Sequence, residues 1–444
     1  MKIYRFFFPV IAPALIIFSI SWMGCTPAKP APENFNSLAE KYVRLGLTIG
    51  QYDPDFVDAY YGPDSLRPVT IKNAVFPKDS LLNAVNELRN RFSPFADSSA
   101  TNDTIRQRAK WISKQLTAFE RRIKIFSAAF ASFDEEATDL FDVKVPVYPE
   151  SHYISLVQEL DSLLPGKGSI PGKVQLLAKQ FIIPKEKVDT VFRTAIEEAR
   201  KRTHAHYALP AEESFILEYV TDKPWSGYNW YKGNYKSVIQ INLDLPIYID
   251  RAIDLACHEG YPGHHVYNML LEKNLFRYKG NVEISLYPLF SPQSLIAEGS
   301  ANYGIDLAFP GTDRNEFSKK VLLPLAGLDT AKADMYFKVL ALKTGLNYAR
   351  NEVARGILNK TMDEKEALRW LTDYCLMSPL TASKSVSFIQ QNRSYVICYN
   401  YGLDLVKNYV ESNGGTADNS LKRWELFGWL LSNPVTPSDL QNKK

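Results

Sequence analysis

The sequence predicts a mainly α-helical protein with one small β-sheet near the middle of the chain. Two stretches, roughly residues 104–205 and 248 to the end, carry apolar residues at helical spacing. Between them, residues 213–245 show the alternation of strands, interrupted by turn residues. With 45% hydrophobic and 23% charged residues, the 444-residue chain has enough apolar surface to bury a sizeable core.

The N-terminus predicts a lipid anchor. Lys2 and Arg5 precede an apolar stretch over 6–20, which has the length of a signal-peptide core and is shorter than the roughly 20 residues of a membrane span. Gly24-Cys25 then resembles a bacterial lipobox, although Trp22 stands where leucine is usual. We therefore expect a lipoprotein signal peptide over 1–24, lipidation of Cys25, and a Pro-rich tether over 25–34. An ordinary cleaved signal with an accidental cysteine is the alternative.

This anchor predicts a place in the cell envelope, on a bacterial membrane and facing the periplasm. The net charge of +3 is too small for so long a chain to favour a nucleic-acid partner. Apart from Cys25, three cysteines remain, and an odd count argues against a disulfide framework. The oligomeric state is left open.

The remaining chain is expected to form one continuous fold. Residues 35–210 are predicted as an N-terminal helical region, with helices over 104–133, 153–164, 173–181 and 185–205. Residues 211–440 are predicted as the region that carries the site. It has strands at 215–220 and 237–243, turns at 225–230 and 232–234, and helix from residue 248 onward.

Histidine is rare in this chain and concentrated in one place. Of six histidines, three fall within the segment His258-Glu259-Gly260-Tyr261-Pro262-Gly263-His264-His265. Neutral imidazole is the commonest protein ligand of zinc, and three protein ligands plus water are typical of a catalytic site. The cluster therefore indicates a metal centre, with Zn²⁺ as the expected cofactor.

The spacing of these histidines does not suit a straight helix. His264 would point about 120° away from His258, and His265 would lie roughly 10 Å further along the axis. Pro262 cannot donate a hydrogen bond to the carbonyl of His258, and Gly263 can adopt backbone angles closed to other residues. A bulge here would bring His264 to His258, so we predict these two as metal ligands, with His265 as the alternative ligand.

Two glutamates complete the predicted centre. Glu259 would accept a proton from water activated by the metal. Glu298 lies on a helix predicted to begin at Ser291-Pro292, among small residues that allow close helix packing. We predict Glu298 as the third ligand, because two histidines and one glutamate are a known catalytic zinc set. A structural ion pair is the alternative.

An arginine and several tyrosines near the C-terminus are further candidates. Arg393 can hold a substrate carboxylate by a two-pronged contact. Tyr399 can donate a hydrogen bond to an oxyanion. For both residues a structural role, as an ion pair or in the core, is open as well. Tyr395 and Tyr401 are interpreted as core residues.

The elements His258-Glu259-x-x-Pro262-Gly263-His264-His265 and Glu298-Gly299-x-Ala301-x-Tyr303 resemble the bacterial domain-of-unknown-function family 885. That family is similar to the helical zinc metallopeptidases and is often found in lipoproteins. The resemblance would cover roughly residues 35–435. It implies a large helical zincin-like metallopeptidase body, with the small sheet beside the active-site helix, and a peptide substrate.

The resemblance has departures. Tyr267 stands where the family usually has glutamine, and Ser300 where a bulky aromatic is common. The segment Arg393-Ser394-Tyr395-Val396 replaces the family's Pro-Gly-Gln-Ala, while Tyr399 and Gly402 match. These changes leave the predicted metal ligands intact and put the substrate preference in doubt.

The leading hypothesis is a zinc-dependent peptidase of the cell envelope with Glu259 as general base. A zinc amidase or esterase acting on cell-wall or other non-peptide bonds is the first alternative. A catalytically silent, peptide-binding lipoprotein is the second. A closed site with four protein ligands, including both His264 and His265, would distinguish it.

Overall fold

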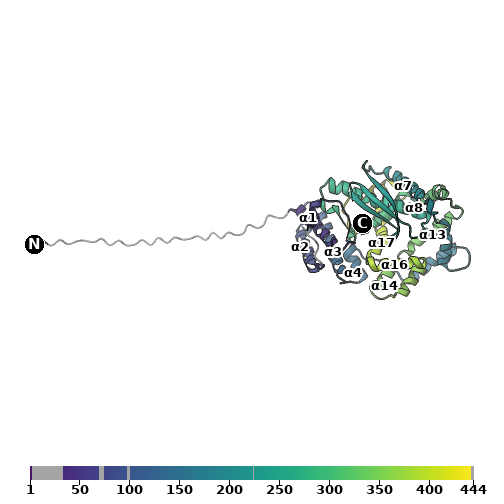
Figure 1. Ribbon diagram of the computed structural model, residues 1–444, viewed down its shortest axis with the longest axis horizontal. Coiled ribbons are helices and arrows are strands. Elements are labelled where there is room, and N and C mark those ends of the chain that lie inside the picture. The colour runs from purple at the N-terminus through teal and green to yellow at the C-terminus, as the bar shows by residue number, and fades with distance from the viewer. Residues whose placement is uncertain (3–33, 70–74, 98–100, 224, 442–444) are drawn as a thin grey trace. The chain divides into compact units, whose positions relative to one another are not determined.

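Helices dominate the chain, as the apolar periodicity predicts (Figure 1). The computed structural model describes residues 1–2, 34–69, 75–97, 101–223 and 225–441. Cys25, and nearly all of the predicted signal peptide and tether, lie outside the described residues. Among the helices that are described, none has both the length and the apolar character needed to cross a membrane.

The predicted N-terminal helical region is present from Phe35 onward. Its helices are α1 (Phe35–Gly50), α2 (Lys78–Asp97), α3 (Asp103–Phe126), α4 (Phe133–Phe141), α5 (Glu150–Leu163), α6 (Ile170–Ala178) and α7 (Val188–His204), with 3₁₀ turns at Asp64–Leu66, Lys179–Phe181 and Lys185–Lys187. Helices α1 to α4 lie together on one side of the body (Figure 1). The helix predicted over 104–133 is present as α3 but ends earlier, at Phe126, and Ser132 begins α4 with a capping box to Glu135.

A three-stranded sheet follows. Its strands are β2 (Ser214–Val220), β3 (Gly227–Gly233) and β4 (Lys236–Asn242), in the order β2-β4-β3. Strand β2 is parallel to β4 and β3 is antiparallel to it. Both predicted strands are found, but the turn predicted over 225–230 is mostly strand β3. Its inward side chains include the polar Asn229 and Tyr231, and this hid the alternation that marks a strand.

A second, two-stranded sheet was not predicted. Strand β1 (Val57–Tyr60) pairs antiparallel with β5 (Leu286–Pro288). Both strands are short and lie far apart in the sequence, so no local sequence pattern predicts their pairing. The pairing ties the N-terminal helices to the segment that precedes α10.

Helices return after the sheet, as predicted. They are α8 (Ile249–Leu255), α9 (His264–Leu271), α10 (Pro292–Ala308), α11 (Asp313–Phe317), α12 (Leu323–Ala326), α13 (Ala333–Leu346), α14 (Ala349–Leu358), α15 (Glu364–Asp373), α16 (Pro379–Asn392), α17 (Ile397–Ser412), α18 (Ser420–Leu431) and α19 (Pro437–Gln441). Shorter π-helical or 3₁₀ segments lie at Ala256–Gly260, Glu272–Arg277, Val282–Ser285, Ser318–Leu322 and Arg393–Val396.

Helix α10 lies at the centre of this half and is buried along most of its length. It begins at Pro292, as predicted, and crosses α17 at a pair of glycines. A Cβ on Gly299 would lie 2.3 Å from the carbonyl oxygen of Gly402. The small residues on α10 therefore allow the two backbones to touch, and Tyr395, just before α17, donates a hydrogen bond to Glu298.

Candidate metal centre

The helix that carries His258 is interrupted before His264. Helix α8 runs into the π-helical segment Ala256–Gly260, and α9 begins at His264. The Gly263 N–H donates to the Cys257 carbonyl at 2.9 Å, six residues back instead of four. A Cβ on Gly263 would lie 2.0 Å from the His258 carbonyl oxygen, so only glycine fits without a shift of the backbone. The interruption turns the two imidazoles toward each other.

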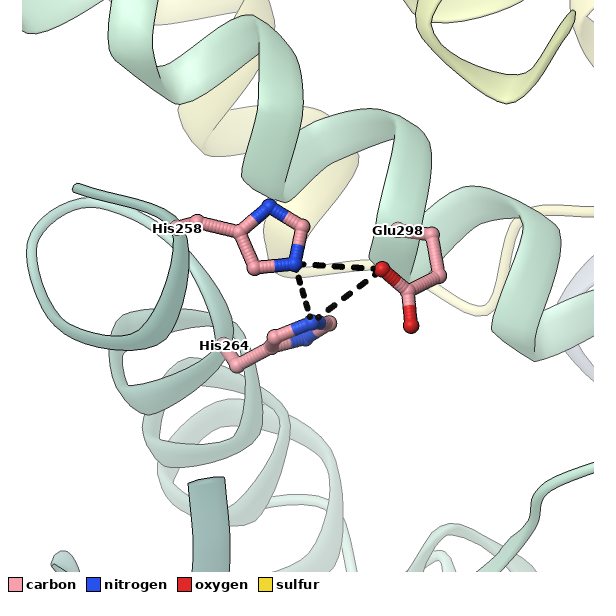
Figure 2. A group of neighbouring side chains, drawn as sticks. All are labelled: His258, His264 and Glu298. Atoms are coloured by element: carbon pink, nitrogen blue, oxygen red, sulfur yellow. Dashed lines mark hydrogen bonds and ion pairs between the residues drawn. The ribbon is translucent and has the colours of Figure 1, made fainter. Parts of the chain in front are cut away.

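Three donor atoms converge at this place (Figure 2). The Nε2 atoms of His258 and His264 are 3.2 Å apart. Glu298 Oε2 lies 3.1 Å from the first nitrogen and 3.5 Å from the second. In a tetrahedral zinc site with bonds of about 2.0–2.1 Å, ligand atoms lie about 3.3 Å apart. The spacing of the three atoms therefore fits one shared metal ion.

The hydrogen bonding of Glu298 also fits a cation. Its Oε1 accepts a hydrogen bond from the Tyr395 hydroxyl at 2.8 Å. Its Oε2 is sealed from solvent and faces the Nε2 atoms of His258 and His264. A buried carboxylate needs a positive charge nearby to offset the cost of its burial. An ion between this oxygen and the two imidazoles would compensate its charge.

Asn302, one helical turn along α10 from Glu298, sets the orientation of His258. Its Nδ2 donates to the Tyr399 carbonyl at 2.7 Å, which identifies Oδ1 as the atom facing the histidine. That Oδ1 lies 2.9 Å from His258 Nδ1. The proton of the neutral ring is thus held on Nδ1, and the lone pair of Nε2 faces the other two donors, as a metal ligand requires.

The charges around the centre favour a cation as well. Burial alone would lower the pKa of the His264 imidazole, but Glu298, Glu259 and Asp58 outweigh it and raise this pKa to about 9. For Glu298, burial would raise the pKa of the carboxyl, but His264 and His258 hold it well below its ordinary value. The carboxylates around His264 therefore favour a positive charge at this place.

Glu259 lies in the same cavity, beside strand β3. Its carbonyl accepts a hydrogen bond from Asn229 Nδ2 at 2.6 Å. A Cβ on Gly227 would come within 3.1 Å of Glu259 Oε1, so the glycine leaves room for the carboxylate. The small sheet thus lies directly against the segment that carries the candidate ligands.

The cavity has a volume of about 800 Å³. Its walls include His258, His264, Glu298, Glu259, Tyr399 and Arg350. Its size falls within the range of clefts that enclose most of a drug-sized ligand. Tyr399 is half-buried in this wall, and no described residue forms a hydrogen bond with its hydroxyl.

His265, the predicted alternative ligand, is occupied elsewhere. Its ring is fully buried, with Nδ1 2.8 Å from Ser237 Oγ and Nε2 3.0 Å from Glu213 Oε2. It therefore links α9 to the sheet, and the described residues offer no fourth protein ligand next to the other three.

Arg393, predicted to hold a substrate carboxylate, forms a structural ion pair. Its Nε and Nη2 lie 2.7 and 2.8 Å from the two carboxylate oxygens of Glu136. The Glu136 side chain is fully buried, and the guanidinium also packs on the Phe130 ring at 4.2 Å. The contacts agree with the structural ion pair that the sequence left open as the alternative, and its partner lies on α4, far away in the sequence.

Sequence reasoning missed several residues of the cavity. Asp58 reaches it from β1 and accepts a hydrogen bond from the Tyr228 hydroxyl. Burial, above all, raises the pKa of Asp58 to about 6. Tyr395, interpreted as a core residue, is buried but donates to Glu298. Only Asn302 carried a usable signal, since it lies one turn after Glu298 on a helix already singled out.

The fold resembles that of several solved proteins. The Pyrococcus furiosus carboxypeptidase matches with a TM-score of 0.50 and 10% identity, over 93% of this chain and 95% of that one. The chain has a mainly helical, zincin-like fold. At such low identity the likeness shows the fold alone.

Two further structures are similar at lower scores. The M32 carboxypeptidase of Deinococcus radiodurans R1 has a TM-score of 0.46 and 10% identity, over 91% of this chain and 93% of that one. A candidate lipoprotein from Colwellia psychrerythraea has a TM-score of 0.49 and 14% identity, over 82% and 70%. No protein-family profile and no curated sequence matches the chain, so membership of family 885 stays a prediction.

Proposed function

We propose that this protein is a zinc-dependent peptidase of the cell envelope. The observation that carries the proposal is the convergence of His258, His264 and Glu298 in a cavity that Glu259 also lines. A zinc ion held there by these three residues would polarise the carbonyl of the scissile bond and lower the pKa of a water molecule. Similarity of the fold to a carboxypeptidase supports a peptide as the substrate.

Other residues of the cavity have roles in proton transfer, in positioning the ligands and in stabilising the oxyanion. The Glu259 carboxylate takes a proton from water and passes it to the leaving amine. Asn302 keeps the lone pair of His258 directed at the ion, and Tyr395 holds Glu298 in place through its other oxygen. Tyr399 lines the cavity with an unengaged hydroxyl, which is available to donate a hydrogen bond to the oxyanion that forms from the peptide carbonyl.

The test compares Glu259→Gln with the unchanged full-length chain. We expect about one zinc per chain in both by elemental analysis, because Glu259 is not a ligand. We expect the variant to cleave peptides at least 100-fold more slowly, as typical of loss of a general base. The control is Glu218→Gln, which makes the same change at an exposed glutamate of β2. Undiminished cleavage by the Glu259 variant would rule out the mechanism.

Substrate profiling separates the related alternative. If the protein hydrolyses amides or esters of cell-wall or small-molecule compounds but no peptide, the zinc chemistry stands and the peptide substrate is wrong. Lack of any hydrolysis by zinc-loaded protein would instead favour a silent peptide-binding lipoprotein. The absence of a fourth protein ligand among the described residues argues against that outcome, because a closed site was its distinguishing feature.

The location of the protein is also proposed from its sequence. We expect Cys25 to carry a lipid that anchors the chain to a bacterial membrane on the periplasmic side. Replacing Cys25 with serine in the full-length chain should move the protein from the membrane fraction to the soluble fraction of lysed cells. Unchanged membrane association of that variant would contradict the anchor.

A further inference from the structure

Arg350 presents an uncompensated charge to the cavity of the proposed peptidase. It lies near the start of α14, is half-buried and lines the cavity wall. Its Nε donates to Ser385 Oγ at 3.0 Å, and the guanidinium carbon lies 4.8 Å from the centre of the Phe388 ring. Both contacts come from α16 and hold the flat guanidinium group in one orientation.

The other arginines of this region have acidic partners, but Arg350 has none among the residues that the structure describes. Arg314 and Arg251 pair with Asp254, and Arg393 pairs with Glu136. Within the part of the chain that the structure describes, no carboxylate lies within 4.0 Å of Arg350, and its Nη1 and Nη2 atoms form no hydrogen bonds. Burial lowers the pKa of this guanidinium, which nonetheless keeps its charge at neutral pH.

A short series of contacts links Arg350 to the metal centre. The Phe388 ring beneath Arg350 lies 6.3 Å from the Tyr399 ring. The Tyr399 carbonyl binds Asn302, which orients His258. Burial, Glu298 and Glu259 raise the pKa of the Tyr399 hydroxyl, whereas Arg350 lowers it. Through Phe388, Arg350 therefore lies next to Tyr399 in the cavity wall.

We propose that Arg350 binds a carboxylate of the peptide substrate and makes the enzyme prefer peptides that carry one near the cleaved bond. The two terminal nitrogens suit a two-pronged contact with a carboxylate. Such a group is either the C-terminal carboxylate or the side chain of an aspartate or glutamate. This proposal rests on the proposed peptidase function and gives Arg350 the role that the sequence assigned to Arg393.

The experiment uses three versions of one cleavable peptide that otherwise lacks acidic residues. The first ends in a free carboxylate, the second in an amide, and the third in an amide with one glutamate added. Their kcat/KM is measured with the unchanged chain, Arg350→Gln and Arg350→Lys. Their Kd is measured by calorimetry on zinc-loaded protein carrying Glu259→Gln, with and without Arg350→Gln. Lys384→Gln is the matched control, because it removes one positive charge from an exposed residue of the same wall.

We expect at least one of the two carboxylate peptides to bind and react on the order of 100-fold better than the neutral amide. Arg350→Gln should abolish this preference and leave the neutral amide within about 3-fold of its original value. Arg350→Lys should retain part of the preference for carboxylate peptides, and Lys384→Gln should retain nearly all of it. The peptide that loses its advantage in Arg350→Gln shows whether Arg350 binds the C-terminal carboxylate or an acidic side chain.

Two outcomes separate this inference from the peptidase proposal. If the unchanged chain cleaves all three peptides alike, or Arg350→Gln keeps the preference, the role of Arg350 is overturned while the peptidase stands. If no peptide is cleaved but a carboxylate peptide binds in a way that depends on Arg350, the binding site stands and the peptidase proposal fails. Absence of both cleavage and binding overturns both.

Discussion

Asn302 Oδ1 lies 2.9 Å from Nδ1 of His258 and is held there because its amide group donates to the Tyr399 carbonyl. The relationship decides which nitrogen of the histidine is free to bind a metal. If Asn302 is replaced with alanine, the ring loses this restraint, and we expect zinc to bind about 10- to 100-fold more weakly. Competition with a chelator of known zinc affinity measures the change.

Asn302→Asp is the conservative companion of that variant. Aspartate keeps an acceptor for His258 but cannot donate to the Tyr399 carbonyl, so we expect most of the zinc affinity to remain. Asn274→Ala serves as the control, because this amide donates to the Ser432 hydroxyl and, among the described residues, makes no hydrogen bond to a candidate ligand. Equal zinc affinity in Asn302→Ala and the unchanged chain would show that the asparagine does not position the ligand.

Gly263 is the residue that allows the two histidines to meet. A methyl group there would lie 2.0 Å from the His258 carbonyl oxygen and 2.3 Å from the Cys257 carbonyl oxygen. Gly263→Ala must therefore shift the backbone between the ligands, and we expect zinc content to fall well below one per chain. Gly345→Ala is the matched control, because the nearest described neighbour of its Cβ would be Leu156, at an ordinary 3.4 Å. Normal zinc content in the Gly263 variant would contradict the steric account.

Local pattern was sufficient to predict much of the candidate centre. His258, Glu259, Pro262, Gly263 and His264 lie within one short segment, so their residue types and spacing could be interpreted together. Glu298 lies outside this segment, so its role could not be predicted from spacing. The small residues of its helix nevertheless indicated a close helix contact. The structure has that contact at Gly299 and brings the three donor atoms together.

What the sequence could not predict depends on contacts between distant segments. The sequence gives no reason to distinguish Arg393 from Arg350. The structure does, because Glu136 of α4 forms an ion pair with Arg393 and not with Arg350. Asp58 enters the cavity through the pairing of β1 with β5, which no periodicity indicates. His265 is removed from the ligand set by Glu213, which precedes β2.

The ion pair of Arg393 with Glu136 gives a prediction about stability. Their side chains are 11% and 0% exposed, so removing one partner leaves the other charged, buried and unpaired. We expect Arg393→Met to lower the free energy of unfolding by about 3–5 kcal/mol, measured by urea denaturation. The double variant Arg393→Met/Glu136→Leu should recover much of this loss, because both charges are gone.

Peptide hydrolysis distinguishes this structural role from substrate binding. At a temperature where Arg393→Met stays folded, we expect its KM to remain within about 2-fold of the original value, since its guanidinium contacts Glu136 and not the cavity. A KM raised by tenfold or more in a folded variant, with no loss of stability, would restore the substrate role that the sequence suggested.

The ionisation of the Glu213 carboxyl is expected to make the stability of the folded protein depend on pH. Burial would raise the pKa of its carboxyl, but hydrogen bonds from His265, Tyr261 and Arg200 outweigh it and lower the pKa from 4.5 to about 2. A carboxyl whose pKa is lower in the folded state stabilises the protein fully above pH 4.5. That stabilisation is lost as the pH falls toward 2.

Glu213→Gln removes this ionisation, so the variant should be less stable than the unchanged chain at pH 7. Because the Arg200 side chain is 48% exposed and its charge is screened by solvent, we expect a difference of about 1–2 kcal/mol. Urea denaturation at pH 7, 5, 4 and 3 should show this difference shrinking below pH 4.5. Glu218→Gln, an exposed change on β2, should show no such trend. A difference that stays constant down to pH 3 would mean that Glu213 contributes through packing and not through its charge.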